Sequence, residues 1–430
     1  MGLPHDIAYT AAALASAPVW GYRLWRTGKW RTDWTGRFGH GEPVTRNGQR
    51  RRLLIHAVSV GEVNAIRNLV DLLARDHADR VELVISTTTD TGHARACQLF
   101  ADKHTVVRYP LDFTFAVRRF LDRVQPDAVA LVELEIWPNF AAACQRRSIP
   151  LVVVNGRLSE RSFARYRLLR PLVRAMFASL AAAAVQTPAY AERFVAMGAG
   201  PDAVHVLDTM KWDTARVADD VPGSDALAAD MHIDRTRPLV VAGSTGPGEE
   251  RLLIDAVRAH CPADTQLLLV PRKPERFNEV AALDPNIIRR TEPRTPNPES
   301  RIFLLDTMGE LRKAYALATV VVVGRSFAGL GGSDPIEPIA LGKPTLIGPD
   351  HHNFADVVDV FEQAGGIVVT AEPGPAIAKM LANPAQAAEL AHHGRAVVRS
   401  RQGSTQRHAN LLLQMLNLAD TPTASSPPCP

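Results

Sequence analysis

The sequence predicts an α/β protein with two doubly wound, parallel-sheet domains, and three observations support this prediction. From residue 52 onward, short apolar segments alternate with amphipathic segments. A polar, turn-rich stretch, Asp213–Pro238, interrupts the alternation, which then restarts. The 430 residues also exceed the size of one ordinary domain. Near-continuous apolar strands separated by helices are typical of a parallel sheet covered on both faces.

The first half contains seven short apolar segments that we expect to form strands. They are Leu53–Val58, Val81–Ser86, Val106–Tyr109, Ala128–Leu134, Leu151–Val154, Ala182–Gln186 and His205–Leu207. Amphipathic segments between them predict helices, among them Glu62–Ala74, Phe113–Arg123 and Trp137–Arg147. This half is expected to form one domain over residues 36–215.

The second half repeats the alternation and is expected to form a domain over residues 216–418. Its predicted strands are Leu239–Ala242, Gln266–Val270, Arg301–Leu305, Val320–Val323, Thr345–Ile347 and Gly366–Val369. A last helical stretch runs from about Ala385 to Leu418, and the tail 419–430 is rich in Pro, Ser and Thr, which is typical of disorder. Two such domains are expected to place the carboxyl ends of both sheets around a central cleft.

Composition excludes several classes of protein. The formal charge of +4, from 49 Lys and Arg against 45 Asp and Glu, is far below that of a nucleic-acid-binding protein. The four cysteines lie far apart, so neither a zinc site nor a disulfide framework is expected. No GxGxxG opens a helix after a strand, and no GxxxxGK[ST] is present. We therefore expect no metal and no bound cofactor.

The N-terminal segment, residues 1–35, has the pattern of a membrane-associated helix. Ile7–Tyr22 is uncharged and mostly apolar, and basic residues follow it, interleaved with Trp20, Trp25, Trp30 and Trp34. Sixteen helical residues span about 24 Å, less than the roughly 30 Å of a hydrocarbon core. Aromatic rings and bases together favour the membrane–water boundary. We expect this segment to seat the protein on the cytoplasmic side of the inner membrane; the alternative is a soluble helix packed on the first domain.

Candidate catalytic residues of the first half follow its strands. His56-Ala-Val-Ser-Val-Gly-Glu62 leaves the first strand and enters a helix, where the helix dipole is expected to keep Glu62 ionised as a general base. The alternative is a carboxylate that only decorates a helix start. Glu133 and Glu135 close the strand Ala128–Leu134, and Lys211, after His205–Leu207, has the charge to meet a phosphate.

Candidate ligand-binding residues of the second half also follow strands. Pro271-Arg272 ends one strand, Met308-Gly309-Glu310 opens a helix, and a glycine-rich loop at Gly331 leads into Asp334-Pro335-Ile336-Glu337. Such a loop offers backbone N–H groups to a phosphate, and a Glu inside the helix can accept hydrogen bonds from a ribose. Asp334, Pro335 and Glu337 also fit the N-cap, N1 and N3 positions of a capping box.

Taken in order, these motifs resemble those of the lipid A Kdo transferases (3-deoxy-D-manno-octulosonic acid transferases), which are inverting GT-B glycosyltransferases. The resemblance covers about residues 20–400 and rests on HAVSVGE (56–62), VELEIWPN (132–139), NGRLSERS (155–162), MKWD (210–213), AGSTGPGEE (242–250), VPRKPERF (270–277), DTMGEL (306–311) and GGSDPIEPIALGKP (331–344). The chain departs from the family pattern at Gly246, where His is common, and at Ser333 and Asp334, where His and Asn are usual.

The resemblance implies a GT-B fold with an acceptor-binding N-terminal domain and a CMP-Kdo-binding C-terminal domain. It implies CMP-Kdo as donor, a tetraacylated lipid A precursor (lipid IVA) as acceptor and CMP as product. Glu62 matches the family's general base, and Glu133 and Lys211 match its transition-state stabilisers. Matching positions for CMP are Pro271, Arg272, Met308, Gly309, Glu310, Asp334, Pro335, Ile336 and Glu337. Two alternatives remain: a transferase for another activated sugar acid, and a non-catalytic lipid- or nucleotide-binding protein on the same fold.

Overall fold

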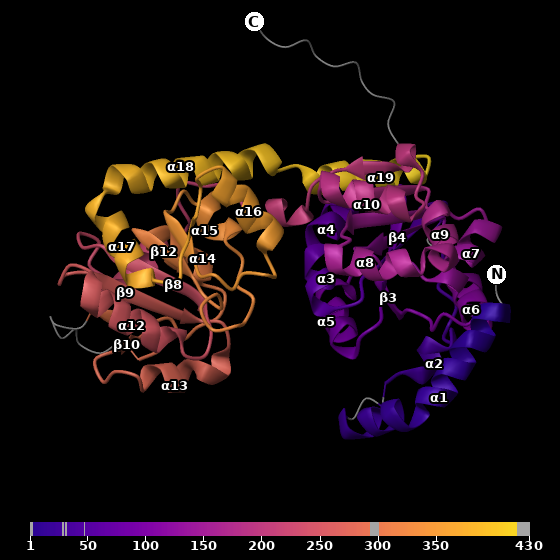
Figure 1. The fold of residues 1–430 in the computed structure, drawn as a ribbon, viewed down its shortest axis with the longest axis horizontal. Helices are drawn as coiled ribbons and strands as arrows, with labels where there is room; N and C mark the ends of the chain where they lie inside the picture. Colours follow the sequence, from indigo (N-terminus) through magenta and orange to yellow (C-terminus); the bar gives the residue numbers. More distant parts are fainter. Residues whose placement is uncertain (1–2, 28–29, 31, 47, 293–300, 419–430) are drawn as a thin grey trace, which may run out of the picture. The chain divides into compact units, whose positions relative to one another are not determined.

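The computed structural model describes residues 3–27, 30, 32–46, 48–292 and 301–418. The chain divides into two compact units (Figure 1). Unit 1 consists of Met1–Asp213 and Gly403–Pro430, and unit 2 consists of Thr214–Gln402. Each unit contains one seven-stranded sheet in which every strand pair is parallel.

The sheet of unit 1 has the strand order β3-β2-β1-β4-β5-β6-β7. Its strands are β1 (Arg51–His56), β2 (Val81–Thr87), β3 (Thr105–Arg108), β4 (Ala128–Val132), β5 (Leu151–Gly156), β6 (Ala182–Val185) and β7 (Val204–Val206). The order reverses between β1 and β4, and the carboxyl ends of these two strands are where a doubly wound sheet binds its ligands.

Helices cover both faces of this sheet because alternate strand residues point to opposite sides. Leu54 and Leu131 pack with α6, α7, α9 and α10, whereas Leu53 and Ala130 pack with α3, α4, α5 and α19. Figure 1 labels these helices around the strands of unit 1. The helices of unit 1 are α1 (Leu3–Thr27), α2 (Trp34–Arg37), α3 (Val60–Ala65), α4 (Arg67–Asp76), α5 (Asp90–Phe100), α6 (Thr114–Val124), α7 (Pro138–Arg146), α8 (Glu160–Leu168), α9 (Arg170–Ala178), α10 (Pro188–Met197) and α19 (Ser404–Met415), with the 3-10 turns η2 (Pro201–Ala203) and η3 (Met210–Asp213).

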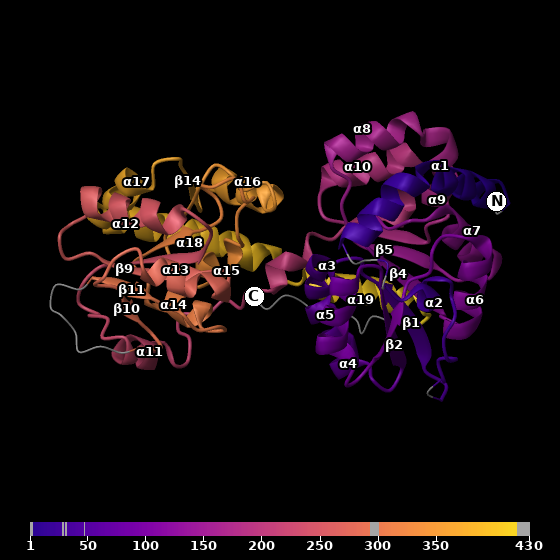
Figure 2. The ribbon, with the colours of Figure 1, turned by 90° about the horizontal axis from the view of Figure 1, so that it is seen from below.

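The sheet of unit 2 has the order β10-β11-β9-β8-β12-β13-β14. Its strands are β8 (Leu239–Thr245), β9 (Gln266–Pro271), β10 (Ile288–Arg289), β11 (Ile302–Leu304), β12 (Val320–Val323), β13 (Thr345–Ile347) and β14 (Val368–Val369). Its helices are α11 (Ser224–Asp230), α12 (Glu249–His260), α13 (Phe277–Ala281), α14 (Leu311–Leu317), α15 (Ile336–Ala340), α16 (Ala355–Gln363), α17 (Pro373–Ala382) and α18 (Pro384–Arg401), with the 3-10 turn η4 (Pro274–Arg276). In Figure 2, α12 and α17 lie above its strands and α11 and α14 below them.

The predicted domain limits need one correction, which concerns the last helix. The sequence predicts one helical stretch over 385–418 within the second domain, but the helix breaks at Gly403, where φ is +87°. The Asp213 carboxylate then accepts hydrogen bonds from the backbone N–H groups of Gly403 (2.7 Å) and Thr405 (2.5 Å) and caps α19. Leu412 of α19, and Leu416 just after it, are buried in the core of unit 1. The burial of this apolar face assigns residues 403–418 to unit 1.

The strand predictions hold to within a few residues, with two differences. The short strand β10 was not predicted, because two residues carry no alternation that a pattern can detect. Strand β4 ends at Val132, so Glu133 and Leu134 lie beyond the strand rather than in it. The predicted tail 419–430 lies outside the described residues.

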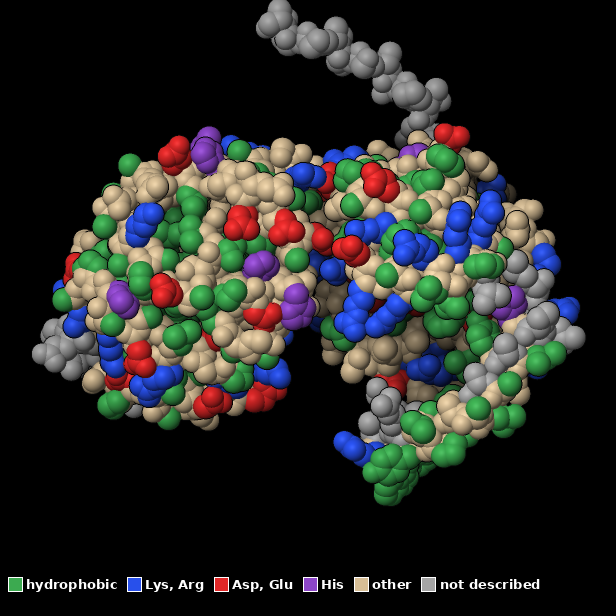
Figure 3. Space-filling model, in the orientation of Figure 1, with side chains coloured by type: hydrophobic (Ala, Val, Ile, Leu, Met, Phe, Trp, Pro, Cys, Tyr) green, Lys and Arg blue, Asp and Glu red, His purple; other side chains and the backbone are tan. Residues whose placement is uncertain are grey.

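Helix α1 contacts the rest of unit 1 through its first turns and exposes apolar side chains further along. The Tyr9 hydroxyl donates to Asp112 (3.1 Å), and Asp6 accepts from the N–H of Thr114 (3.0 Å). Further along, Leu14 and Trp25 are each 72% exposed, and Figure 3 shows hydrophobic side chains along this segment. Among the described residues, no helix combines the length and the apolarity needed to cross a membrane.

Candidate active site

Glu62 lies in the first turn of α3 and takes part in a capping box. The Ser59 hydroxyl accepts from the Glu62 N–H (3.5 Å) and donates to Oε1 of Glu62 (2.8 Å). Oε2 accepts from the N–H of Val58 (2.8 Å). Glu62 therefore stabilises the start of α3, which is the role that the alternative interpretation gives it. The same hydrogen bonds also fix the orientation of its carboxyl group.

The ionisation of Glu62 differs from the prediction. Burial raises its pKa from 4.5 to about 7, against the hydrogen bonds from Val58 and Ser59, and the charges of Glu133 and Glu135 raise it further. Desolvation thus acts against the ionisation that the helix dipole is expected to favour, and it outweighs the hydrogen bonds from Val58 and Ser59. A pKa near neutrality suits a group that must take up a proton during a reaction.

Glu133 and Glu135 follow β4, the strand next to β1, so their side chains enter the same part of unit 1 as Glu62. The backbone of Glu133 has φ +62°, a left-handed conformation that is unfavourable for a residue with a Cβ. Glu135 accepts a hydrogen bond from the indole N–H of Trp137 (3.0 Å), and burial raises its pKa. Backbone strain of this kind is common at functional sites, where surrounding contacts maintain it.

These carboxyl groups line one cavity of about 370 Å³ within unit 1. Its lining residues are Glu62, Glu133, Leu134, Glu135, Arg157, Ser159, Ser162 and Tyr166. They come from the segments after β1, β4 and β5, which are neighbouring strands. The cavity thus lies at the carboxyl edge of the sheet beside its switch point.

Lys211 lies on η3, outside this set of lining residues. Its N–H donates to the Thr209 hydroxyl (3.3 Å), and the preceding Met210 N–H donates to the side chain of Asn155 (3.2 Å), which lies in β5. The structure therefore brings Glu62 and Glu133 together, and places Lys211 in the same unit on a different segment.

In unit 2, the candidate ligand-binding residues lie at the carboxyl ends of β9, β11 and β12. The buried phenol of Tyr315 links several of them: burial raises its pKa, the charges of Glu337 and Asp334 raise it further, and that of Arg272 lowers it. The loop after β9 and the segment that enters α15 thus both place charges that act on this phenol. Glu310 lies at the start of the Tyr315 helix; burial acts to raise its pKa, but hydrogen bonds from Thr307 and Lys313 prevail and lower it.

The predicted capping box at 334–337 does not form. Helix α15 begins at Ile336, and Asp334 accepts from the Ile336 N–H (2.9 Å) in a local turn instead of capping residue N3. Glu337 lies 3.8 Å from Arg312, and burial raises its pKa. The Glu337 carboxylate therefore faces Arg312 and does not cap this helix.

Sequence reasoning missed the two acids that hold the loops of unit 2, Glu249 and Glu250. Both are 1% exposed. The Glu249 carboxylate accepts from the N–H groups of Gly246 (2.7 Å), Arg325 (2.6 Å) and Phe327 (2.9 Å) and so ties together the loops after β8 and β12. Glu250 accepts two hydrogen bonds from Arg276 (2.7 and 3.0 Å). The sequence signal that could have identified them is a pair of adjacent acids at the start of an amphipathic helix.

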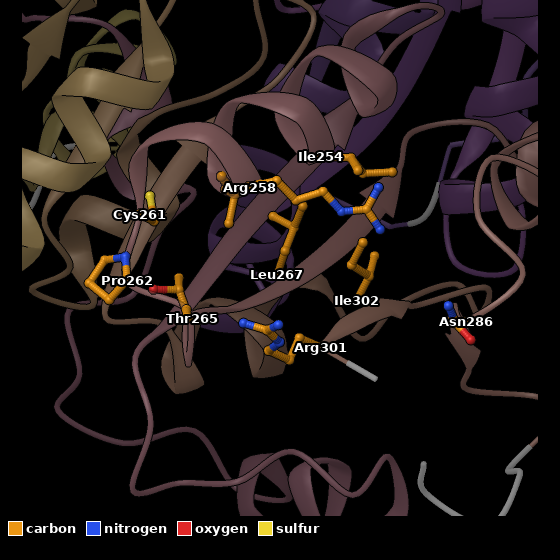
Figure 4. A pocket seen from close by; sticks show the side chains of 11 residues that line it. Ile254, Arg258, Cys261, Pro262, Thr265, Leu267, Asn286, Arg301 and Ile302 are labelled. Carbon is orange, nitrogen blue, oxygen red and sulfur yellow. The ribbon is translucent and has the colours of Figure 1, made fainter. Parts of the chain in front are cut away.

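A second cavity, of about 250 Å³, lies at the opposite edge of the unit 2 sheet (Figure 4). Leu267 and Ile302 line it from the first residues of β9 and β11, and Arg258 lines it from the last turn of α12. The candidate donor residues follow the other ends of these strands, so this cavity is separate from them. Within the described part of the chain, no group of three or more His, Cys, Asp or Glu side chains is arranged to hold a metal ion.

The fold is that of the GT-B glycosyltransferases. The solved structure of MurG from Acinetobacter baumannii matches 85% of this chain and 99% of its own, with a TM-score of 0.55 at 12% identity. This likeness concerns the fold, and the predicted α/β architecture of two Rossmann-like units is confirmed.

Sequence comparison then identifies the family. The family model described as 3-deoxy-D-manno-octulosonic-acid transferase matches residues 32–214. A 3-deoxy-D-manno-octulosonic acid transferase of Haemophilus influenzae is 32% identical over 84% of this chain and 86% of its own. A Bordetella pertussis enzyme of the same name is 31% identical over 94% of this chain and 98% of its own. The chain belongs to the Kdo transferase family and is a glycosyltransferase that transfers Kdo in lipopolysaccharide biosynthesis.

Proposed function

We propose that this enzyme transfers Kdo, with inversion, from CMP-Kdo to a tetraacylated lipid A precursor and releases CMP. The observation that carries the proposal is the cavity in which Glu62, with a pKa of about 7, shares space with Glu133. A base and a second carboxylate are what an oxocarbenium-like transfer to a hydroxyl requires.

In the proposed reaction, the acceptor hydroxyl gives its proton to Glu62 as its oxygen forms a bond to the anomeric carbon of Kdo. The bond from that carbon to the phosphate oxygen of CMP breaks, and its electron pair leaves with CMP. Glu133 offsets the positive charge that develops on the sugar, and Lys211 offsets the negative charge on the departing phosphate. Each step uses a group of the chain or of the substrates.

The proposed nucleotide contacts lie in unit 2. Arg272 provides a cation, and the carboxylates of Glu310 and Glu337 are the acceptors for hydroxyl groups of the ribose and for the cytosine amino group. Pro271, Met308, Gly309, Asp334, Pro335 and Ile336 complete the proposed CMP site. The convergence of Arg272, Asp334 and Glu337 on Tyr315 supports a common site.

The proposed acceptor and membrane contacts lie in unit 1. Helix α8 lines the cavity with Ser162 and Tyr166, and exposed arginines of α8 and α9 flank, in the sequence, Leu168, which is 82% exposed. Bases beside apolar side chains favour an anionic lipid surface. With the exposed apolar side chains of α1, they support seating on the cytoplasmic face of the inner membrane.

A transfer assay tests the proposal. Purified protein, radiolabelled CMP-Kdo and a tetraacylated lipid A precursor should yield labelled lipid and free CMP. Transfer from another CMP-linked sugar acid, but not from CMP-Kdo, would favour the alternative donor. CMP binding without any transfer would favour the non-catalytic alternative.

A further inference from the structure

The cavity around Glu62 contains an arginine for which the proposed reaction has so far no use. Arg157 directly follows β5, which pairs in parallel with β4 through Val132 and Val154. The carboxyl ends of these neighbouring strands bring Arg157 to the cavity that Glu133 and Glu135 also line. Of the described residues that line this cavity, Arg157 alone has a cationic side chain.

The chemistry of the sugar brings a further anion close to Glu62. Kdo is a 2-ulosonic acid, so its carboxylate is bonded directly to the anomeric carbon. A base acts at about 2.6–3.2 Å from the hydroxyl oxygen, and that oxygen attacks from about 3–3.5 Å. The sugar carboxylate, one bond further, therefore lies within roughly 7 Å of the Glu62 carboxyl group wherever the reaction takes place.

In this cavity, the sugar carboxylate meets two protein carboxyl groups that repel it, those of Glu133 and Glu135. A guanidinium group compensates for this repulsion, because its planar fork binds a carboxylate through two parallel hydrogen bonds. Ser162 adds a donor: its Oγ accepts from the Ser159 hydroxyl (3.1 Å), so its own proton can be donated to a ligand.

We propose that Arg157, assisted by the Ser162 hydroxyl, binds the carboxylate of the transferred sugar acid and makes the enzyme specific for donors that carry it. This inference deepens the proposed function and rests on it. A neutral sugar would leave the guanidinium without this partner, and would lose the orientation that holds the anomeric carbon opposite the acceptor hydroxyl. Arg157 is thus a specificity-determining residue of the donor sugar, distinct from the residues proposed to bind CMP.

Two donors and two Arg157 variants test the inference. The donors are CMP-Kdo and its analogue in which the sugar carboxylate is a carboxamide; the variants are Arg157→Gln and Arg157→Lys. The unaltered enzyme should prefer the carboxylate donor by about 10- to 100-fold in kcat/KM, the range expected for a hydrogen bond to a charged group. Arg157→Gln should reduce the preference to a few-fold, and Arg157→Lys should give an intermediate value.

Controls separate this role from a structural one. Calorimetric CMP affinity should not change in the Arg157 variants, because CMP lacks the sugar carboxylate. Arg75→Gln, on an exposed arginine of α4, should keep the full preference. An equal loss with both donors would show that Arg157 only neutralises Glu133 and Glu135, and would overturn the inference.

The unaltered enzyme provides a test that does not depend on the folding of any variant. A preference below two-fold would by itself overturn the inference while leaving Kdo transfer intact. Absence of transfer from CMP-Kdo by the unaltered enzyme would overturn the proposed function and this inference together.

Discussion

The raised pKa of Glu62 makes a prediction that links catalysis to stability. In the folded enzyme burial raises this pKa from 4.5 to about 7, so between these values the folded state holds a proton that the unfolded chain has released. The free energy of unfolding therefore falls as the pH rises from about 4.5 to 7, and above pH 7 the ionised, buried carboxyl of Glu62 destabilises the folded state by its full amount. Glu62→Gln removes this titration but keeps a side chain that suits a capping box.

The size of the effect follows from the pKa. One pKa unit corresponds to about 1.4 kcal/mol, so a rise from 4.5 to about 7 amounts to at most about 3 kcal/mol, and the partial exposure of Glu62 reduces it. Only part of this titration falls between pH 5 and pH 8, so the free energy of unfolding of Glu62→Gln, relative to that of the unaltered protein, should increase by about 2 kcal/mol over this range. Over the same range, transfer by the variant should be about 10²–10⁴-fold slower.

Urea denaturation at a series of pH values measures the first effect, and the labelled transfer assay measures the second. In the unaltered enzyme, kcat/KM should rise with pH to a half-maximum near 7, because Glu62 must lose its proton to act as a base. Glu135→Gln should move this midpoint to lower pH, since the Glu135 charge raises the pKa of Glu62. A stability difference that does not vary with pH, or transfer by Glu62→Gln within a few-fold of the unaltered rate, would refute the reasoning.

Three further predictions concern strain, nucleotide binding and the membrane. Glu133→Gly and Glu133→Ala should both reduce transfer, but the Gly variant should unfold with a free energy about 1 kcal/mol higher, since glycine tolerates φ +62°; equal stability in denaturation would show that the strain is absent. Glu337→Gln should weaken CMP binding about tenfold in calorimetry, with little change in Tm because its carboxylate makes no capping bond; unchanged affinity would remove Glu337 from the site. Replacing Leu14 and Trp25 by Ser should shift the protein from membranes to the soluble fraction while Tyr9 still contacts Asp112; if the unaltered protein is already soluble without detergent, the membrane proposal fails.

The parts of the fold that depend on local pattern could be predicted from the sequence. Strands such as β4 and β12 are uninterrupted apolar segments, and burial on both faces explains that pattern. The assignment of α19 to unit 1 could not be predicted in this way. The pattern shows that Leu412 must be buried, but not against which sheet, and the Asp213 cap that directs the helix comes from far away in the sequence.

In the candidate site too, the features that depend on local sequence could be predicted and those that depend on tertiary contacts could not. Glu62 and Glu133 could be proposed from the sequence because each follows a strand at the edge where ligands bind and matches a residue of the family that the motifs resemble. The raised pKa of Glu62 could not be predicted, since its desolvation depends on residues that follow other strands and lie far away in the sequence. Helix α15 shows the same limit: the spacing of Asp334 and Glu337 satisfies a capping box, yet the helix starts two residues after Asp334 and Glu337 lies beside Arg312.

The return of α19 to unit 1 has a consequence for the order in which the chain is made and folded. During synthesis, residues 1–213 leave the ribosome long before α19, which shares one face of their sheet with α3, α4 and α5. At about 5–20 residues per second, the intervening residues 214–402 delay that helix by on the order of tens of seconds. Unit 2 can complete its core in that interval, whereas the nascent N-terminal unit exposes the apolar residues that α19 later covers. The last unit to finish folding is therefore the first to be translated, and premature termination before codon 404 should yield an aggregation-prone product.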